Sequence, residues 1–139
     1  MSLTDEFIAA WNAQDGAALA ALFTADGVYA DAALDERSAG PEEIEKFLSG
    51  AYEHFSSDMT FEKGFSLETA SGYAVEWTMK GHHDQDGPDL PKTGKPYSVP
   101  GISIGEVRDG KITRNTDYWS LATFLMQVGL MPAPEGATA

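Results

Sequence analysis

The spacing of apolar residues changes along this chain. In residues 3–13 and 17–23 apolar positions recur at intervals of three and four, and the same spacing returns after Gly40-Pro41, so three helices are predicted. Thr4 stands where an N-cap would open the first of these helices. From about residue 58 onward the period shortens to two, which is typical of strands. A helical first part and a strand-rich second part are therefore expected.

Turn signals divide the rest of the chain into short elements. Asp26-Gly27 leads into a first strand, Asp109-Gly110 predicts a tight hairpin turn, and Ser120 opens a closing helix that ends within 127–130. Helices followed by an antiparallel meander make an α+β layout. We expect one domain over residues 1–132 and a flexible C-terminal tail over 133–139. The predicted strands cover residues 28–31, 59–67 with a bulge at Gly64, 73–83, 97–107 and 111–119.

Side-chain alternation sorts the residues of the two clearest strands into faces. In residues 73–83 the apolar face also carries a histidine, His83, whereas the opposite face holds Glu76, Thr78, Lys80 and His82. In residues 111–119 both faces are mixed, so periodicity alone does not tell which one is inside. One of these faces carries Thr113, Asn115, Asp117 and Trp119, and the apolar face of the earlier strand carries Tyr73, Val75, Trp77, Met79 and Gly81 beside His83.

Composition narrows the possible functions. The chain has 139 residues, no cysteine and a formal net charge of −13. The charge argues against nucleic acid and anionic membranes as partners, since both need clustered Lys and Arg. No apolar run reaches the roughly 20 residues that span a membrane, and the N-terminus is unlike a secretory signal, so the cytoplasm is the expected location. Thiolate and zinc–cysteine chemistry are excluded.

Two stretches carry a family resemblance. The first holds Trp11, Asp15 and Asp26, and the second runs over residues 109–130 with Asp117 near its centre. Together they resemble the nuclear transport factor 2-like fold, and within it the SnoaL-like polyketide cyclase and ester cyclase group. The resemblance implies a cone-shaped, strongly curved antiparallel or mixed sheet that encloses a pocket with the N-terminal helices. It also implies a homodimer.

The resemblance implies a catalytic site at the Asp117 face. Asp117 would exchange a proton with the substrate, and His83, in a Gly81-to-Asp84 stretch followed by Thr93-Gly94-Lys95, would relay or tune that proton. Two alternatives stay open: Asp117 only caps the last helix or holds a neighbouring loop, and His83 is a half-exposed strand end. A metal at His82 and His83 is disfavoured, because adjacent strand residues point to opposite faces. The expected substrate-binding residues are Tyr29, Asp31, Asn115, Trp77, Met79 and Trp119, with no metal or cofactor.

Other activities of this fold match less well. Asp31 falls where ketosteroid isomerases carry their base, but Phe7 and Ser103 replace the two donors that would stabilise the enolate. Limonene-type epoxide hydrolases need an Arg and a second Asp, and Trp77 and Met79 stand there instead. The cyclase-like group usually has a further acid at the position of Ser120.

Two classes of function therefore remain open. The first is acid–base catalysis on a small hydrophobic carbonyl compound of polyketide type, as a cyclase or an isomerase. The second is a non-catalytic, dimeric ligand-binding domain of the same fold, which the missing acid at Ser120 favours.

Overall fold

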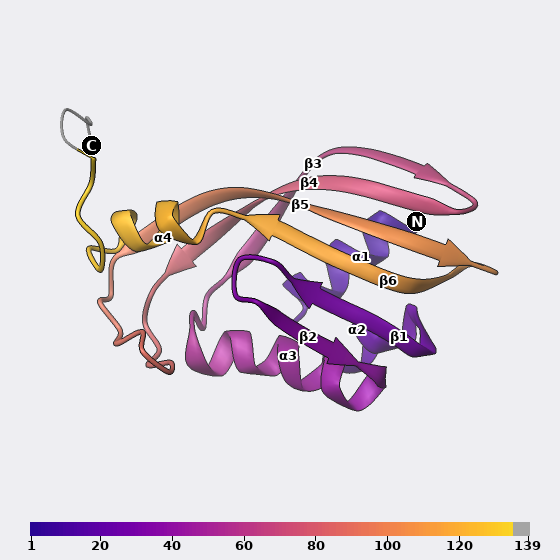
Figure 1. The fold of residues 1–139 in the computed structure, drawn as a ribbon, viewed down its shortest axis with the longest axis horizontal. Coiled ribbons are helices and arrows are strands. Elements are labelled where there is room, and N and C mark those ends of the chain that lie inside the picture. The colour runs from indigo at the N-terminus through magenta and orange to yellow at the C-terminus, as the bar shows by residue number, and fades with distance from the viewer. Residues whose placement is uncertain (135–139) are drawn as a thin grey trace.

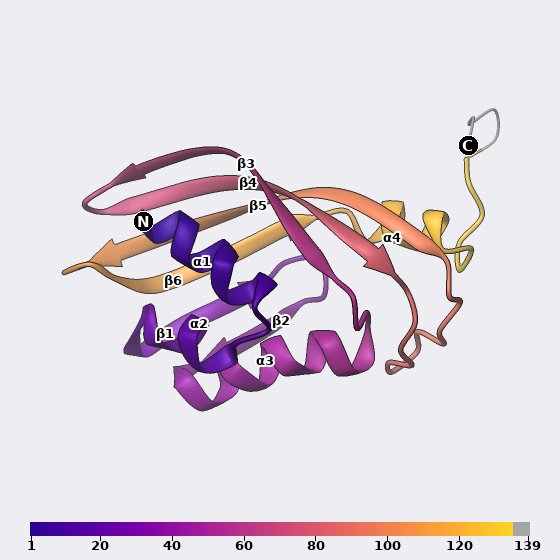
Figure 2. The ribbon, with the colours of Figure 1, turned by 180° about the vertical axis from the view of Figure 1, so that it is seen from behind.

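A computed structural model describes residues 1–134 and contains one curved, six-stranded sheet. The strand order is β2-β1-β6-β5-β4-β3, and three helices lie along one side of the sheet while a fourth lies at its far end (Figures 1 and 2). The sheet does not close on itself. The helices are α1 (Leu3–Asn12), α2 (Gly16–Ala21), α3 (Gly40–His54) and α4 (Leu121–Gln127), and the strands are β1 (Phe23–Asp31), β2 (Glu36–Ala39), β3 (Thr60–Thr69), β4 (Gly72–His82), β5 (Pro96–Arg108) and β6 (Lys111–Trp119).

The long meander follows the sequence prediction. β4 pairs with β5 and β5 with β6, both antiparallel. Asp109 and Gly110 both adopt positive φ, 52° and 78°, which suits the twist of a two-residue hairpin. The β3–β4 register shifts between Lys63 and Ser66, where a bulge was expected at Gly64. The curved α+β architecture is thus confirmed.

The first half of the sheet differs from the prediction. β2 was not predicted, because Glu36–Ala39 is short and polar and buries only Ser38. Phe23, which the helical spacing assigned to the second helix, begins β1 instead. The β1–β6 register shifts between Phe23 and Val28, so the Asp26-Gly27 turn is an irregularity inside one strand. Periodicity misses such a strand because its two parts are out of phase.

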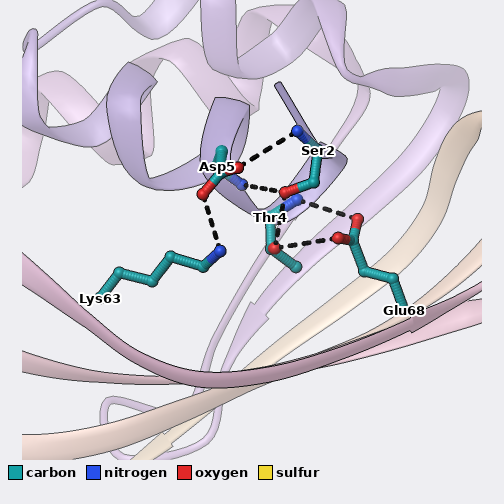
Figure 3. Close-up of polar contacts among 5 residues, drawn as sticks. All are labelled: Ser2, Thr4, Asp5, Lys63 and Glu68. Carbon is teal, nitrogen blue, oxygen red and sulfur yellow. Dashed lines mark hydrogen bonds and ion pairs between the residues drawn. The ribbon is translucent and has the colours of Figure 1, made fainter.

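Polar contacts fasten the start of α1 to β3 (Figure 3). The N-cap is Ser2 and not Thr4: the Ser2 hydroxyl accepts from the Asp5 amide at 3.1 Å, and the Asp5 carboxylate accepts from the Ser2 amide at 3.2 Å. Thr4 is buried and donates twice to the Glu68 carboxylate. Lys63 donates to Asp5 at 2.7 Å. These bonds place α1 across the concave side of the sheet.

The parallel pairing of β1 with β6 decides where the site forms. It brings a strand from the first quarter of the chain beside the last strand (Figure 1) and sets Asp31 directly opposite Asp117.

Along residues 1–134, no helix is long and apolar enough to cross a membrane. Residues 133 and 134 belong to no helix or strand, and the rest of the expected tail, 135–139, lies outside the described residues.

Candidate functional site

An apolar cavity of about 430 Å³ lies between α3 and the concave face of the sheet. Its walls are mostly aromatic and aliphatic, and two carboxyl groups, Asp31 and Asp117, open onto it. Such a site suits a hydrophobic ligand that is oriented by a few polar groups. The lining residues are Trp11, Asp31, Leu34, Glu36, Lys46, Phe47, Gly50, Ala51, His54, Phe55, Met59, Phe61, Trp77, Met79, Gly87, Pro88, Leu90, Asp117 and Trp119.

Three hydrogen bonds hold the Asp117 carboxyl group. The Tyr29 hydroxyl donates to Oδ2 at 2.5 Å. The Ser103 hydroxyl and the Asn115 amide donate to Oδ1 at 2.6 Å and 2.9 Å. Asp117 is 6 % exposed and its three donors are all buried, so this carboxyl group is held in one orientation at the end of the cavity.

A second layer of donors orients the first. The Trp77 indole donates to the Ser103 hydroxyl at 2.9 Å, and the Tyr73 hydroxyl donates to the Asn115 carbonyl oxygen at 2.6 Å. The second bond requires the Asn115 amide nitrogen to face Asp117. A network in which every member is satisfied can specify one arrangement of a polar core.

Small residues on β5 make room for this network. A Cβ on Gly101 would lie 2.3 Å from the Trp77 ring, and a Cβ on Gly105 would lie 2.3 Å from the Tyr73 ring. Real Cβ atoms do not approach so closely. Ser103 stands between these glycines on the same face and pairs with Asp117 across the strands. The alternation of Gly, Ser and Gly therefore lets two large rings lie flat over β5.

Asp31 provides a second carboxyl group on the neighbouring strand. It is 5 % exposed and accepts hydrogen bonds from the Trp119 indole at 3.0 Å and the Leu34 amide at 3.0 Å. Its position follows from the parallel β1–β6 register, in which Asp31 is opposite Asp117. Two acids thus share one apolar wall.

Burial decides the ionisation of this pair. The pKa of Asp117 is raised to about 7: loss of hydration and, to a smaller extent, the negative charge of Asp31 raise it, and its three donors oppose the rise. Burial also raises the pKa of Asp31. The pKa of Tyr29 lies well above its usual value because burial and the nearby carboxylates disfavour a phenolate, so Tyr29 stays a donor. Near neutral pH, both the protonated and the ionised form of Asp117 are therefore populated.

His83 does not join this site. Its side chain is fully buried on the expected face, but it is not among the residues that line the cavity. Its ring packs against Phe55 and Phe124, with centroid distances of 5.9 Å and 5.3 Å. Its Nδ1 lies 3.3 Å from the Thr93 hydroxyl. The expectation that Asp117 and His83 open onto one cavity is wrong, because Phe55 lines the cavity and packs against the His83 ring, which does not reach it.

The other expected site residues fall into two groups. Trp77, Met79 and Trp119 line the cavity together with the two acids. Tyr29 and Asn115 lie behind it, where they hold Asp117 and do not face a ligand. Sequence reasoning missed Ser103 as a donor to Asp117, although the alternation of Gly101, Ser103 and Gly105 is visible in the sequence.

The wall also contains aromatic side chains that were not among the expected site residues. Trp11 and Phe47 both line the cavity, and their rings meet at right angles with centroids 6.0 Å apart. The centroid of the Phe61 ring lies 5.3 Å from that of Trp11 and 5.2 Å from that of Trp77.

Within residues 1–134, no three His, Asp or Glu side chains converge in a way that could hold a metal ion.

Known proteins share this architecture. A protein of ketosteroid isomerase-like fold from Catenulispora acidiphila, solved with trimethylamine, is 26 % identical, with a TM-score of 0.80 over 93 % of each chain. A candidate polyketide cyclase from Pseudomonas putida is 27 % identical, with a TM-score of 0.76 over 91 % of this chain and 98 % of the other. One from Xanthomonas campestris shares the fold at 24 % identity, with a TM-score of 0.81 over 91 % and 93 %.

Sequence comparison gives the same grouping. Among proteins with curated descriptions, none matches this chain. The SnoaL-like domain matches residues 4–115, which is most of the chain; the match includes α3 and β5 and ends within β6, before Asp117 and Trp119. This chain therefore belongs to the SnoaL-like domain family.

Proposed function

We propose that this protein catalyses proton transfer at the carbon beside the carbonyl group of a small, hydrophobic, ring-forming compound of polyketide type. The observation that carries the proposal is a buried, hydrogen-bonded carboxyl group, Asp117, at the end of an aromatic cavity. The nearby acid Asp31 and the cavity volume of about 430 Å³ support the same class of substrate.

In the proposed scheme Asp117 acts first as a base. Its carboxylate takes a proton from the carbon beside the carbonyl, and the electrons of the broken C–H bond form an enolate. The neutral Asp117 then returns the proton, either to another carbon, as in an isomerase, or to the oxygen that becomes an alkoxide when the enolate closes a ring, as in a cyclase. A pKa of about 7 suits both steps, because each form is populated at neutral pH.

The other cavity groups have supporting roles in this scheme. Trp77 and Trp119 form flat walls for a ring, and Met79 adds an apolar side chain to the same cavity. Asp31, when protonated, donates a hydrogen bond to a substrate oxygen. Tyr29, Ser103 and Asn115 keep the Asp117 carboxyl group in place. No step calls on a metal or an organic cofactor.

Hydrogen–deuterium exchange tests the proposal without knowledge of the natural substrate. The protein is added to 2-tetralone in D₂O, and the loss of the proton signals beside the carbonyl is followed by NMR. We expect exchange to be faster than in buffer alone and to return to the buffer rate in Asp117→Asn. Equal rates with the native protein and the variant would refute catalysis by Asp117.

A non-catalytic ligand-binding domain is the second candidate. It is favoured by Ser120, whose hydroxyl only caps α4 where relatives usually carry an acid. In that case 2-tetralone would bind without acceleration of exchange, and Asp117→Asn would change affinity alone.

We also propose that the protein acts in the cytoplasm and that two copies pair through the outer face of the sheet. Glu76, Thr78 and Lys80 were expected on that face, and exposed apolar side chains accompany them: Phe65, Leu67, Ile104 and Tyr118. A two-fold interface places the same patch on both copies. We expect light scattering to give a dimer mass at micromolar concentration and Ile104→Glu to give a monomer. A monomer mass for the native protein would refute the pairing.

A further inference from the structure

Gly50 is unusual among the glycines of residues 1–134. Each of the others either adopts positive φ or would bring a Cβ within 3.4 Å of another group. A Cβ on Gly50 would meet nothing within 4 Å, and its φ is not positive. Gly50 also lies inside the 15-residue helix α3, where glycine is less favourable than alanine. Neither backbone conformation nor close packing explains this residue.

The location of Gly50 suggests why a residue without a side chain stands there. Lys46, Gly50 and His54 are spaced one helical turn apart, so they form one row along α3, and all three line the cavity. The side chains of Lys46 and His54 are 75 % and 62 % exposed, so this row lies at the mouth of the cavity. Gly50 is thus a gap in the rim between two long side chains.

The neighbouring row of α3 is different. Phe47, Ala51 and Phe55 line the cavity one residue further along the helix and are partly buried against the core. The Phe47 ring packs against the Tyr29 ring with a centroid distance of 5.1 Å. The wall behind the rim is therefore filled, and the gap at Gly50 is confined to the mouth.

A loop borders the mouth next to His54. Residues 87–90, which include the cavity-lining Gly87, Pro88 and Leu90, lie against the end of α3. A Cβ on Gly87 would lie 2.5 Å from the His54 carbonyl oxygen, so the loop and the helix are in direct contact there. Of these two glycines on the mouth, Gly87 marks a contact and Gly50 marks an open space.

We propose that Gly50 determines specificity by leaving a passage for an extended ligand. The inference rests on the proposed function: a ring carbonyl compound lies with its ring against Trp77 and Trp119. Its chain of several carbon atoms passes over Gly50, between Lys46 and His54, to solvent. The substrate class is then a ring or aryl ketone with a chain, and not a compact ketone that fits wholly inside the cavity.

Two aryl ketones that differ only in chain length test this passage. Acetophenone carries only a methyl group on its carbonyl carbon. Hexanophenone carries an alkyl chain there that is four carbon atoms longer. Binding is followed by the quenching of tryptophan fluorescence, because all three tryptophans of the chain line the cavity. In Gly50→Leu we expect hexanophenone to bind at least about tenfold more weakly, since a leucine would fill the gap, while acetophenone stays within about threefold of native. Gly50→Ala should give a smaller loss in the same direction.

A matched variant controls for changes to the helix. Ser49 is exposed on α3, next to Gly50, and does not line the cavity, so Ser49→Leu adds the same side chain outside the mouth. It should leave both ketones unaffected. Thermal unfolding of each variant checks that the helix is intact.

The outcomes separate this inference from the proposed function. Equal losses for both ketones in Gly50→Leu, or no loss for hexanophenone, would overturn the passage while leaving Asp117 catalysis untouched. If neither ketone binds the native protein, both the passage and the ketone class are wrong. If 2-tetralone exchange is independent of Asp117 but the chain-length effect is present, the passage stands and catalysis fails.

Discussion

Asp117 and His83 are both buried on the concave face of one sheet, yet only Asp117 reaches the cavity. Asp117 lies on β6 opposite Asp31, accepts three hydrogen bonds and borders an open volume. His83 directly follows the end of β4, behind Phe55, with one contact from a ring nitrogen to Thr93. Asp117 has the surroundings of a reactive group, and His83 those of a packed core residue.

The difference shows that face and burial are not enough to identify a functional group. Strand parity placed His83 inward and the family resemblance placed Asp117 inward, and both side chains are buried. What separates them is the position along the strand, since the aromatic side chains near α4 fill the end where His83 lies. Access to open volume distinguishes a group that can meet a substrate from one that only packs.

Activity should show the largest contrast between these two residues. Asp117→Asn should lower the rate of 2-tetralone exchange about 10²- to 10⁴-fold, because the only proton-transferring group in the scheme is lost. His83→Gln should keep the rate within about threefold of native, which corresponds to less than about 1 kcal/mol in the barrier. Initial rates by NMR at pH 7.5 measure both. A loss with His83→Gln as large as with Asp117→Asn would restore His83 to the mechanism.

Stability against pH should respond to the two residues in opposite directions. The pKa of folded Asp117 is about 7, above its unfolded value, so its contribution is fully present below about pH 4 and is lost as the pH rises through 7. Between pH 5 and 7.5 the native protein should lose about 2–3 kcal/mol of unfolding free energy that Asp117→Asn does not lose. Urea unfolding of both proteins at the two pH values gives the difference. Parallel pH dependences would contradict the raised pKa.

His83 should oppose that trend. Burial lowers the pKa of His83, so the folded state favours the neutral ring, and stability is lost as the pH falls below the unfolded value near 6.5. At pH 7.5, His83→Gln should cost about 1–3 kcal/mol through lost packing, and the cost should shrink toward pH 5. The same urea series measures it. A cost that grows toward acid pH would mean that the buried ring carries a charge.

Removal of single hydrogen-bond donors around Asp117 should give the smallest effects. It tests how much each donor lowers the pKa of Asp117. Tyr29→Phe deletes a direct donor to the carboxylate, so the midpoint of the pH–rate profile should move upward and the rate at pH 7 should fall about three- to tenfold. Tyr73→Phe deletes a donor that acts only through Asn115 and should shift the midpoint less. Equal shifts would show that the two layers act as one unit.

The sequence by itself determined much of this protein. The meander of β4, β5 and β6, the hairpin at Asp109-Gly110 and the inward face of β4 follow from alternation and turn chemistry, which are local. Asp117 was chosen because the family resemblance pointed to the strand on which this acid lies. These features depend on neighbours a few residues apart, so a single sequence is enough to find them.

Only the tertiary structure decided how these faces form a site. The pairing of β1 with β6 joins segments about 86 residues apart in sequence, and it alone brings Asp31 opposite Asp117. The donors Ser103 and Tyr29, the separation of His83 from the cavity and the bare rim at Gly50 all depend on which strands and helices meet. Hydrophobic spacing tells which side chains are buried, but burial is non-directional, and the partner of each buried group is set by packing of the whole chain.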